Sequence, residues 1–462
     1  MFNQRMCKIM VVLGVLAALL LSGCGKPDLP LSQSAAPPAA APTAVAQVAS
    51  RPSADQLYIR TANGASSERL TIIDGVSGAR ERELPVGLVA PNWSALYTAK
   101  DSFAAGQHKT EIRAIDPKTG QTLRETTIDG AYALPVIGPS GTFGGLSSNG
   151  RWLVLEATPG QVAGRWQSNL VVLDSAFIKA PRYAKFDADD IYRFDGINNS
   201  GDGLYLIQQL ASAPQAPYQV RFYDLASGVL DPNIVVAKGE EDVMSGARQA
   251  AALAPGGEWL YSLYLNTEHG PFIHALNLAN RFAVCIDLPK DSKGDEDKQS
   301  YWSLVMSPRG EELYAVNGAL NMVVDVDTNQ LQIRRTSMIA MPAASVGPLD
   351  DLARWLVPVA TAKSQARAGA VLSRDGKTLF MLGQQGVLAI NTADLTLQNR
   401  YLADRTLMSI ALSSDGTRLY AISAAPNAGG RIIQLNPANG AIISEAQSDL
   451  SLMELLRVAA RS

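Results

Sequence analysis

A repeated pattern of turn and strand signals constrains the fold of this chain more than any other feature. Each copy starts with a short turn signal containing Ser, Asn, Pro, Asp or Gly, and a short apolar run follows at once. The copies are Ala90–Tyr97, Ser148–Val154, Asn199–Tyr205, Ala254–Tyr261, Ser307–Tyr314, Ser373–Phe380 and Ser414–Tyr420. Self-similarity at a regular spacing indicates a fold built from one repeated supersecondary unit.

Each copy lies between other strand-like runs. An apolar run such as Ser303–Met306 precedes most copies, and an alternating run closed by Asp or Asn, such as Arg431–Asn436, follows. A polar run such as Leu331–Arg335 comes last, as expected for an outer strand that faces solvent. Four short strands in about 50 residues are typical of a β-propeller blade. We therefore predict an all-β fold, a single propeller of four-stranded blades over residues 56–462.

One copy carries a resemblance to a known family. Residues 413–423 read SSDGTRLYAIS, and the strand after them ends in the turn Asn436-Pro-Ala-Asn-Gly440. This resembles the YVTN-type, WD-repeat-like β-propeller unit of bacteria, which reads approximately SPDGxxLYVxN and then VxVIDxxTG. The resemblance covers the whole folded region, but the copies are degenerate, and Gly201-Asp202 interrupts the third. It implies the propeller fold and no one activity, because propellers host enzymes, sensors and scaffolds alike.

The two ends of the repeat region predict how the ring closes. Residues Leu57–Arg60, Leu70–Asp74 and Arg80–Leu84 match the second, third and fourth strands of a blade, and no first strand precedes them. The run Met453–Ala459 stands where a first strand belongs. We expect the two ends to share one blade, since closure hides two sheet edges. This makes eight blades, or seven if one copy is a decorated loop.

The N-terminus has the anatomy of a secretory signal. Arg5 and Lys8 precede the apolar run Ile9–Leu21, which is shorter than the about 20 residues that span a bilayer as a helix. An N-terminal membrane helix is therefore the weaker interpretation. The next residues complete the tetrapeptide LSGC, which resembles the bacterial lipobox at every position. The resemblance implies a signal peptide over residues 1–23 and lipidation of Cys24.

A tether follows the predicted anchor. Residues 24–55 are dominated by Ala, Pro and Ser, a composition that cannot bury enough apolar surface to fold. We expect an extracytoplasmic lipoprotein attached to a membrane through its acyl chains. Gly25 stands where an Asp retains lipoproteins at the inner membrane of enteric bacteria. This favours the outer membrane if the host has one, and otherwise the outer face of the plasma membrane.

The side chains that usually carry chemistry are scarce. The three histidines, His108, His269 and His274, stand in no metal-ligand spacing, so we expect each to be hydrogen-bonded or solvated. Cys285 lies in an apolar run, so we expect a buried, inert thiol. The acidic stretch Asp287–Lys298 lacks the calcium-loop pattern, and its lysines indicate solvated surface. We predict no catalytic residue, metal site or cofactor. The formal net charge of −3 suggests no nucleic-acid partner.

The longest departure from the repeat is residues 337–368. It contains a short helical stripe, and we take Leu349, Asp350, Asp351 and Trp355 as candidate binding residues. Propeller function usually depends on loops at one face of the ring. An equal alternative is that the insertion caps a blade or fills the channel.

Three functional hypotheses remain. The first is a binding or scaffold module for an envelope protein or glycan, and an absence of catalytic motifs favours it. The second is an enzyme of the propeller lactonase type with a metal site in the central channel, against which the poverty of histidine counts. The third is an envelope assembly factor. Whether the protein is an enzyme therefore stays open, with no turnover favoured.

Overall fold

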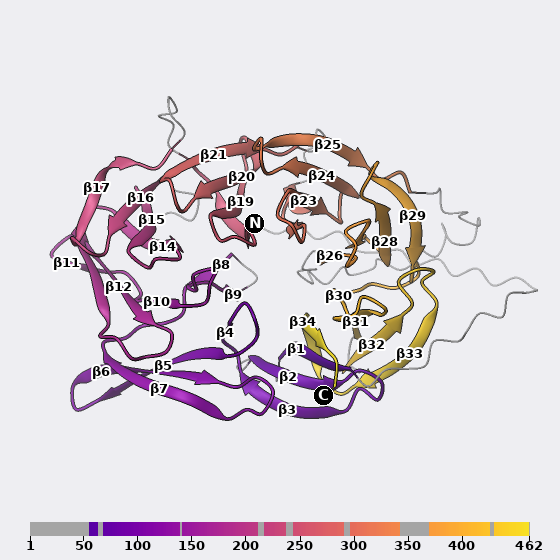
Figure 1. Ribbon diagram of the computed structural model, residues 1–462, viewed down its shortest axis with the longest axis horizontal. Coiled ribbons are helices and arrows are strands. Elements are labelled where there is room, and N and C mark those ends of the chain that lie inside the picture. Colours follow the sequence, from indigo (N-terminus) through magenta and orange to yellow (C-terminus); the bar gives the residue numbers. More distant parts are fainter. Residues whose placement is uncertain are drawn as a thin grey trace, which may run out of the picture. The chain divides into compact units, whose positions relative to one another are not determined.

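The computed structural model describes residues 55–62, 68–138, 141–210, 217–236, 244–290, 296–341, 369–425 and 429–461. The predicted signal peptide, residues 1–23, lies outside this range, as does the predicted tether apart from its last residue. Eight four-stranded antiparallel sheets are arranged as the blades of a ring (Figure 1). The prediction of an eight-bladed β-propeller is thereby confirmed.

The blades are numbered from the one in which the described chain begins, and their strands are given from the channel outwards. Blade 1 consists of β34 (Ser451–Ala459), β1 (Gln56–Ala62), β2 (Glu68–Asp74) and β3 (Arg80–Pro85). Blade 2 consists of β4 (Leu88–Val89), β5 (Leu96–Ala104), β6 (Gln107–Ile115) and β7 (Thr122–Asp129). Blade 3 contains β10 (Trp152–Glu156), β12 (Arg165–Asp174) and β13 (Arg182–Ala188), with the short β11 (Gly160–Val162) beside β12. Blade 4 consists of β14 (Ile191–Ile197), β15 (Gly203–Gln209), β16 (Tyr218–Asp224) and β17 (Val229–Ile234).

The second half of the ring is more regular. Blade 5 consists of β18 (Ala247–Leu253), β19 (Trp259–Asn266), β20 (Gly270–Asn277) and β21 (Phe282–Asp287). Blade 6 consists of β22 (Trp302–Met306), β23 (Glu312–Asn317), β24 (Met322–Asp327) and β25 (Gln332–Met338). Blade 7 consists of β26 (Ala370–Leu372), β27 (Thr378–Leu382), β28 (Val387–Asn391) and β29 (Thr396–Tyr401). Blade 8 consists of β30 (Ser409–Leu412), β31 (Leu419–Ala425), β32 (Gly429–Leu435) and β33 (Ile442–Ser448).

The ring closes as the sequence predicts. β34, from the C-terminal end, pairs antiparallel with β1, and the register runs from Gln56 opposite Ala459 to Ala62 opposite Ser451. The hydroxyl of Tyr420 in blade 8 donates a hydrogen bond to Asp55 Oδ2, 2.9 Å away, just before blade 1 begins. The two chain ends therefore share one blade and leave no unpaired edge at the seam.

The repeat signals correspond to hydrogen-bonded turns. In blade 7, Asp375 Oδ1 accepts from the Ser373 hydroxyl at 2.7 Å and from the backbone N–H of Lys377 at 3.1 Å. The Ser373 hydroxyl oxygen in turn accepts from the backbone N–H of Thr378 at 2.9 Å. Gly376 adopts φ of 72°, a left-handed conformation that glycine accepts without strain. Blade 8 repeats these contacts at Ser413 and Asp415.

The Asp or Asn that closes the third strand has a matching role in seven of the eight blades. Its side-chain oxygen accepts from backbone N–H groups two or three residues ahead, which forms the turn to the fourth strand. The residues with this contact are Asp74, Asp116, Asp224, Asn277, Asp327, Asn391 and Asn436. Burial raises the pKa of Asp74, but hydrogen bonds from Ser77, Val76 and Arg461 outweigh it and lower that pKa to about 2.

The core is distributed around the ring. Eight clusters of buried apolar side chains occur, one at each junction between neighbouring blades. At the junction of blades 4 and 5, for example, Tyr205 and Phe222 pack against Leu260 and Leu276. The Tyr205 hydroxyl also donates to the Leu278 carbonyl oxygen of the next blade at 2.8 Å. Because both faces of each inner strand are covered, β20 is buried at every position, whereas β25 alternates.

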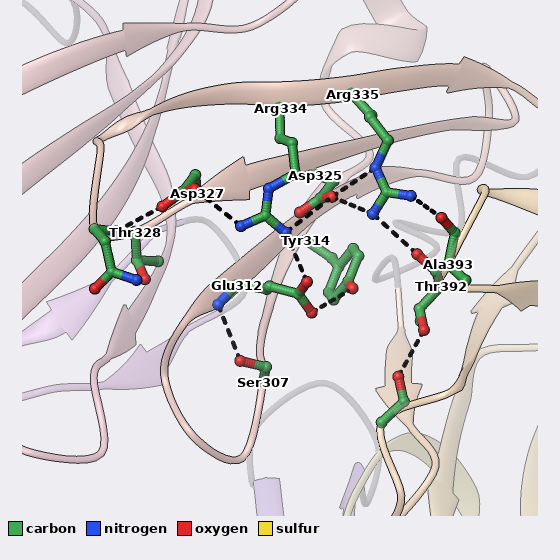
Figure 2. A network of polar contacts seen from close by, with 12 residues as sticks. Ser307, Glu312, Tyr314, Asp325, Asp327, Thr328, Arg334, Arg335, Thr392 and Ala393 are labelled. Carbon is green, nitrogen blue, oxygen red and sulfur yellow. Dashed lines mark hydrogen bonds and ion pairs between the residues drawn. The ribbon is translucent and has the colours of Figure 1, made fainter.

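A polar network reinforces the junction of blades 6 and 7 (Figure 2). Asp325 on β24 is fully buried, and Arg335 on β25 contacts it through Nε at 3.0 Å. The same guanidinium donates from Nη2 to the Thr392 carbonyl oxygen of blade 7 at 3.0 Å. Arg334 bridges Asp327 at 2.9 Å and Glu312 at 2.7 Å. Both arginines are thus held by contacts within the ring, which indicates a structural role.

The connections between strands differ at the two faces of the ring. Consecutive strands are antiparallel, so the 1–2 and 3–4 connections leave at one face and the 2–3 and 4–1 connections at the other. No connection at the first face, the smooth face, is longer than 175–181. The second face, the decorated face, carries the long connections 235–246, 288–301 and 339–369. The connection 288–301 includes the short helix α1 (Glu296–Gln299). No helix in the described part of the chain is long and apolar enough to cross a membrane.

Candidate functional site

Blade 3 departs from the repeat in a way that alters the central channel. Ala133 and Leu146 form single bridges to β10 in place of a continuous first strand. Between them the chain forms a hairpin of β8 (Val136–Ile137) and β9 (Thr142–Phe143), which lies inside the ring (Figure 1). We call residues 135–144, of which 139 and 140 are outside the described range, the channel hairpin.

The channel hairpin contacts blades on opposite sides of the ring. A Cβ added at Gly138 would overlap the carbonyl oxygen of Gln249 on β18, so the hairpin backbone packs directly on blade 5. A Cβ at Gly141 would lie 2.8 Å from the Arg60 guanidinium of blade 1. Arg60 is itself buried and forms ion pairs with Glu68 and, at 3.8 Å, Glu454. The hairpin therefore occupies the channel from blade 5 to blade 1.

A group of buried polar side chains lies where blades 4 and 5 meet. We call it the blade 4–5 cluster, and it consists of Asp195, Tyr218, Arg248, Ser262, Tyr264 and His274. The antiparallel register explains part of this grouping. Ser262 on β19 is opposite His274 on β20, which is opposite Cys285 on β21, so the three side chains share one face of blade 5. Tyr264 is two residues from Ser262 and shares that face.

Two β-bulges on neighbouring innermost strands shape the cluster. In β14 the register shifts between Phe194 and Gly196, which leaves Asp195 as the extra residue. In β18 it shifts between Arg248 and Ala250. A bulge re-aims the side chains around it, and bulges are common beside functional sites. Arg248 Nη1 and Asp195 Oδ1 lie 3.0 Å apart as an ion pair, and the Asp195 side chain is fully buried.

Polar atoms of this cluster lack hydrogen-bond partners among the described residues. They are both carboxylate oxygens of Asp195, Nε and Nη2 of Arg248, the hydroxyls of Tyr218, Ser262 and Tyr264, and Nε2 of His274. Each buried, unpaired polar group costs about 1–3 kcal/mol, so this set together would rival the about 5–15 kcal/mol of net stability of a whole domain. Groups that the described residues do not include, ordered water among them, are therefore needed to complete these hydrogen bonds.

Burial shifts the titration of the cluster. Burial lowers the pKa of His274 to about 4, and the positive charge of Arg248 adds to the effect. Burial raises the pKa of Asp195, and Arg248 opposes that rise. Burial likewise raises the pKa of Tyr218 and of Tyr264. At neutral pH, His274 is thus a neutral imidazole with a lone pair on one ring nitrogen.

The structure corrects two expectations drawn from the sequence. Cys285 is exposed rather than buried, because β21 is the outer strand of its blade, although its side chain lies on the face of blade 5 that is turned towards blade 4. His274 is buried, yet its Nε2 has no protein partner within the described residues. The other two histidines behave as expected. His108 Nδ1 lies 2.9 Å from Asp101 in an exposed hairpin, and His269 is exposed beside Glu268.

Several predicted site residues lie outside the described residues. These are the lipidation residue Cys24 and the candidate binding residues Leu349, Asp350, Asp351 and Trp355. The strands that flank the insertion are described. β25 ends at Met338 and β26 begins at Ala370, so the insertion starts and ends at the decorated face. Within the described part of the chain, no three His, Cys, Asp or Glu side chains are close enough to hold a metal ion.

Sequence reasoning missed Asp195 and Arg248. Neither belongs to a motif, and both stand in runs that match an ordinary innermost strand. Each bulge lies within a hairpin of consecutive strands, but the approach of Asp195 to Arg248 depends on packing between two blades, which leaves no local pattern. The alignment of Ser262, His274 and Cys285 could have been predicted from the sequence, because adjacent strands of one predicted blade place these residues opposite one another.

Fold and site together define the protein as an eight-bladed β-propeller with a hairpin inside the ring and a polar junction between two blades. No protein-family model matches the chain, and no curated protein matches it. Among solved structures it is similar to apo AztD from Citrobacter koseri, at 12% identity and a TM-score of 0.47, over 88% of this chain and 97% of that one. It is also similar to PpgL, a periplasmic gluconolactonase of Pseudomonas aeruginosa, at 16% identity and a TM-score of 0.47, over 88% and 99% of the two chains.

Proposed function

We propose that this protein is an extracytoplasmic lipoprotein, anchored through Cys24, whose propeller binds an envelope protein or glycan through the decorated face. The proposal also assigns the repeat to the YVTN type of β-propeller unit. The lipobox match and the Ala- and Pro-rich segment after it support the anchor. A scaffold role and a role in envelope assembly are both forms of this binding function.

The unequal faces of the ring are the observation that carries the proposal. The smooth face has only short, hydrogen-bonded turns. The long connections belong to the decorated face, as do two projecting hairpins, β5–β6 in blade 2 and β11–β12 in blade 3. These hairpins end near Phe103 in blade 2 and Val162 in blade 3, which are 65% and 62% exposed. Binding residues concentrate on loops that a rigid scaffold positions, and exposed apolar side chains at their tips suit contact with a partner.

The channel hairpin favours binding over channel chemistry. A lactonase-type site needs metal ligands and substrate space around the central channel. Here the hairpin backbone packs on Gln249 of blade 5 and approaches Arg60 of blade 1. Arg60 forms an ion pair with Glu68, so its positive charge is balanced within the ring.

Matched surface variants test this proposal. In one set, Phe103→Ser with Val162→Ser, or deletion of residues 342–364 with a Gly-Ser turn, alters the decorated face. In the control set, Ile178→Ser with Val229→Ser alters exposed apolar residues of the smooth face. Cross-linking in cells, followed by purification from solubilised membranes and sedimentation with cell-wall glycan, gives the readout.

We expect the decorated-face variants to lose a partner that the wild type and the smooth-face variant retain, with all variants melting at similar temperatures. Equal recovery of the same partner by all variants would contradict the proposal. Metal-dependent hydrolysis of lactones by the purified protein would also contradict it.

A further inference from the structure

Three sulfur- and nitrogen-bearing side chains meet beside the blade 4–5 cluster. Cys285 Sγ lies 3.7 Å from Met244 Sδ and 3.9 Å from His274 Nδ1. Cys285 is exposed, Met244 is partly buried, and His274 is buried at 1% exposure. Thiol, thioether and imidazole groups are all metal ligands in proteins. Their grouping at these separations therefore points to a metal site.

We propose that Met244, His274 and Cys285 form a binding site for a soft monovalent metal ion, Cu(I). Soft thiolate and thioether ligands select Cu(I), and imidazole also suits copper. In proteins, metal–sulfur bonds are about 2.3 Å and metal–nitrogen bonds about 2.0 Å, so three ligands around one ion are about 3.5–4 Å apart. The two separations measured from Cys285 Sγ fall in that range.

Two of the three ligands come from paired strands, and Met244 comes from the connection 235–246. His274 and Cys285 are directly opposite each other on β20 and β21. Met244 precedes β18 and is tied to blade 4, because its backbone exchanges hydrogen bonds with Tyr218 at 2.7 and 3.1 Å. The site therefore spans the junction of two blades, and each ligand comes from hydrogen-bonded backbone. Residues on paired strands, as His274 and Cys285 are, hold their geometry better than residues on loops.

Charge favours a monovalent ion over a divalent one. Binding replaces the thiol proton of Cys285, which passes to solvent, so a Cu(I)–thiolate unit carries no net charge. The nearby Arg248 and Asp195 cancel each other as an ion pair. A divalent ion would leave an uncompensated positive charge near Arg248, whose side chain is 10% exposed, and this repulsion has a cost.

The state of His274 fits a ligand role. The Nδ1 atom of His274 lies towards Cys285. A metal ion bound at Nδ1 would leave the ring proton on Nε2, which is buried and has no hydrogen-bond partner among the described residues. Metal-bound histidines usually donate that second N–H to a carboxylate, a carbonyl or water. Asp195, whose carboxylate lacks hydrogen bonds, belongs to the same cluster.

The test uses the purified full chain with Cu(I) itself as the probe, supplied without oxygen as its bicinchoninate complex. Cys285→Ser and Met244→Leu each remove one ligand with little change in volume. Met338→Leu and His108→Gln are matched controls, because both residues are exposed and lie on other blades. X-ray absorption at the copper edge identifies the ligand atoms, and Zn²⁺ titration tests selectivity.

We expect the wild type and both controls to take one equivalent of Cu(I), bound by two sulfurs and one nitrogen. Loss of an outer-shell partner costs about 10- to 100-fold in metal affinity, so Cys285→Ser should lose at least that much, and Met244→Leu a smaller factor. Unchanged affinity in Cys285→Ser, or a preference for Zn²⁺ over Cu(I), would overturn the assignment. The partner-capture assay does not involve these residues, so the two proposals fail separately.

Discussion

Tyr420 and Asp55 are 365 residues apart in sequence, yet the tyrosine hydroxyl donates to the carboxylate at 2.9 Å. Both side chains are buried, and Gln434 donates to the same hydroxyl. The contact joins the last whole blade to the residue that leads into β1. It therefore belongs to the seam of the ring, together with the pairing of β1 and β34.

Tyr420→Phe tests the hydrogen bond at the seam. Removing the hydroxyl leaves Asp55 and Gln434 buried without this partner, which costs about 1–3 kcal/mol. We expect a lower midpoint in urea with an unchanged m-value. Tyr183→Phe is the control, since Tyr183 is 41% exposed, and its midpoint should stay within error of the wild type. Equal midpoints for both variants would show that the seam does not depend on this contact.

Removing residues 452–462 tests ring closure. The truncation takes away most of β34, exposes the edge of β1 and strips Leu452, Leu455 and Val458 from the apolar cluster between blades 8 and 1. We expect loss of the cooperative thermal transition of the whole domain, measured by calorimetry. Removal of Arg461 and Ser462 alone, which leaves β34 intact, should lower the melting temperature only slightly. A truncated chain that melts like the full one would disprove closure by β34.

The buried ion pair of Asp195 and Arg248 predicts strongly non-additive variants. Arg248→Leu leaves a buried carboxylate without its counter-ion, which costs about 3–5 kcal/mol. We expect the double variant Asp195→Leu with Arg248→Leu to recover most of that loss, since it removes both charges. Urea unfolding of the wild type, both single variants and the double variant gives the coupling energy. Additive effects would mean that the pair is not coupled in the native protein.

His274 predicts a pH dependence of stability. Its folded pKa of about 4 lies below the ordinary histidine value of 6.5, so the unfolded chain binds more protons between these values. The contribution is present above pH 6.5 and falls as the pH drops towards 4, by roughly 3 kcal/mol in total. The raised pKa of Asp195 gives the opposite slope.

Comparison with a variant isolates the histidine. His274→Leu should show a shallower fall in unfolding free energy between pH 6.5 and 4.5 than the wild type. His108→Gln, which changes an exposed histidine, should follow the wild type. Parallel curves for the wild type and His274→Leu would rule out the buried imidazole as the source.

Cys24→Ser tests the lipid anchor. The full lipobox match predicts that the thiol of Cys24 carries the diacylglycerol. We expect cells labelled with a palmitate analogue to lose the label on this protein in the variant, while Cys285→Ser retains it. Label that persists on Cys24→Ser would refute the lipoprotein assignment.

The repeat and the closure of the ring were predictable because they depend on local signals. Turn residues such as Ser373, Asp375 and Gly376 act within one hairpin, and the apolar and polar alternation follows from which strand faces solvent. The missing first strand before Leu57, matched by the surplus run after Leu452, was enough to predict the shared blade.

The channel hairpin and the blade 4–5 cluster were decided only by tertiary structure. Residues 135–144 have the composition of an ordinary loop, and their position in the channel depends on contacts with Gln249 and Arg60 in distant blades. Cys285 stands in an apolar run, but it is exposed because β21 is the outermost strand of its blade.

By itself, the sequence determined the strand count per blade and the shared closing blade, because hairpins and amphipathic alternation are short-range properties. It left seven or eight blades open, and the structure decided eight. Only the tertiary structure decided which side chains from different blades meet. Asp195 reaches Arg248, and Met244 reaches Cys285, through bulges and inter-blade packing that depend on the whole ring. Contacts between elements far apart in the chain have no local signature, and they are the contacts that form the site.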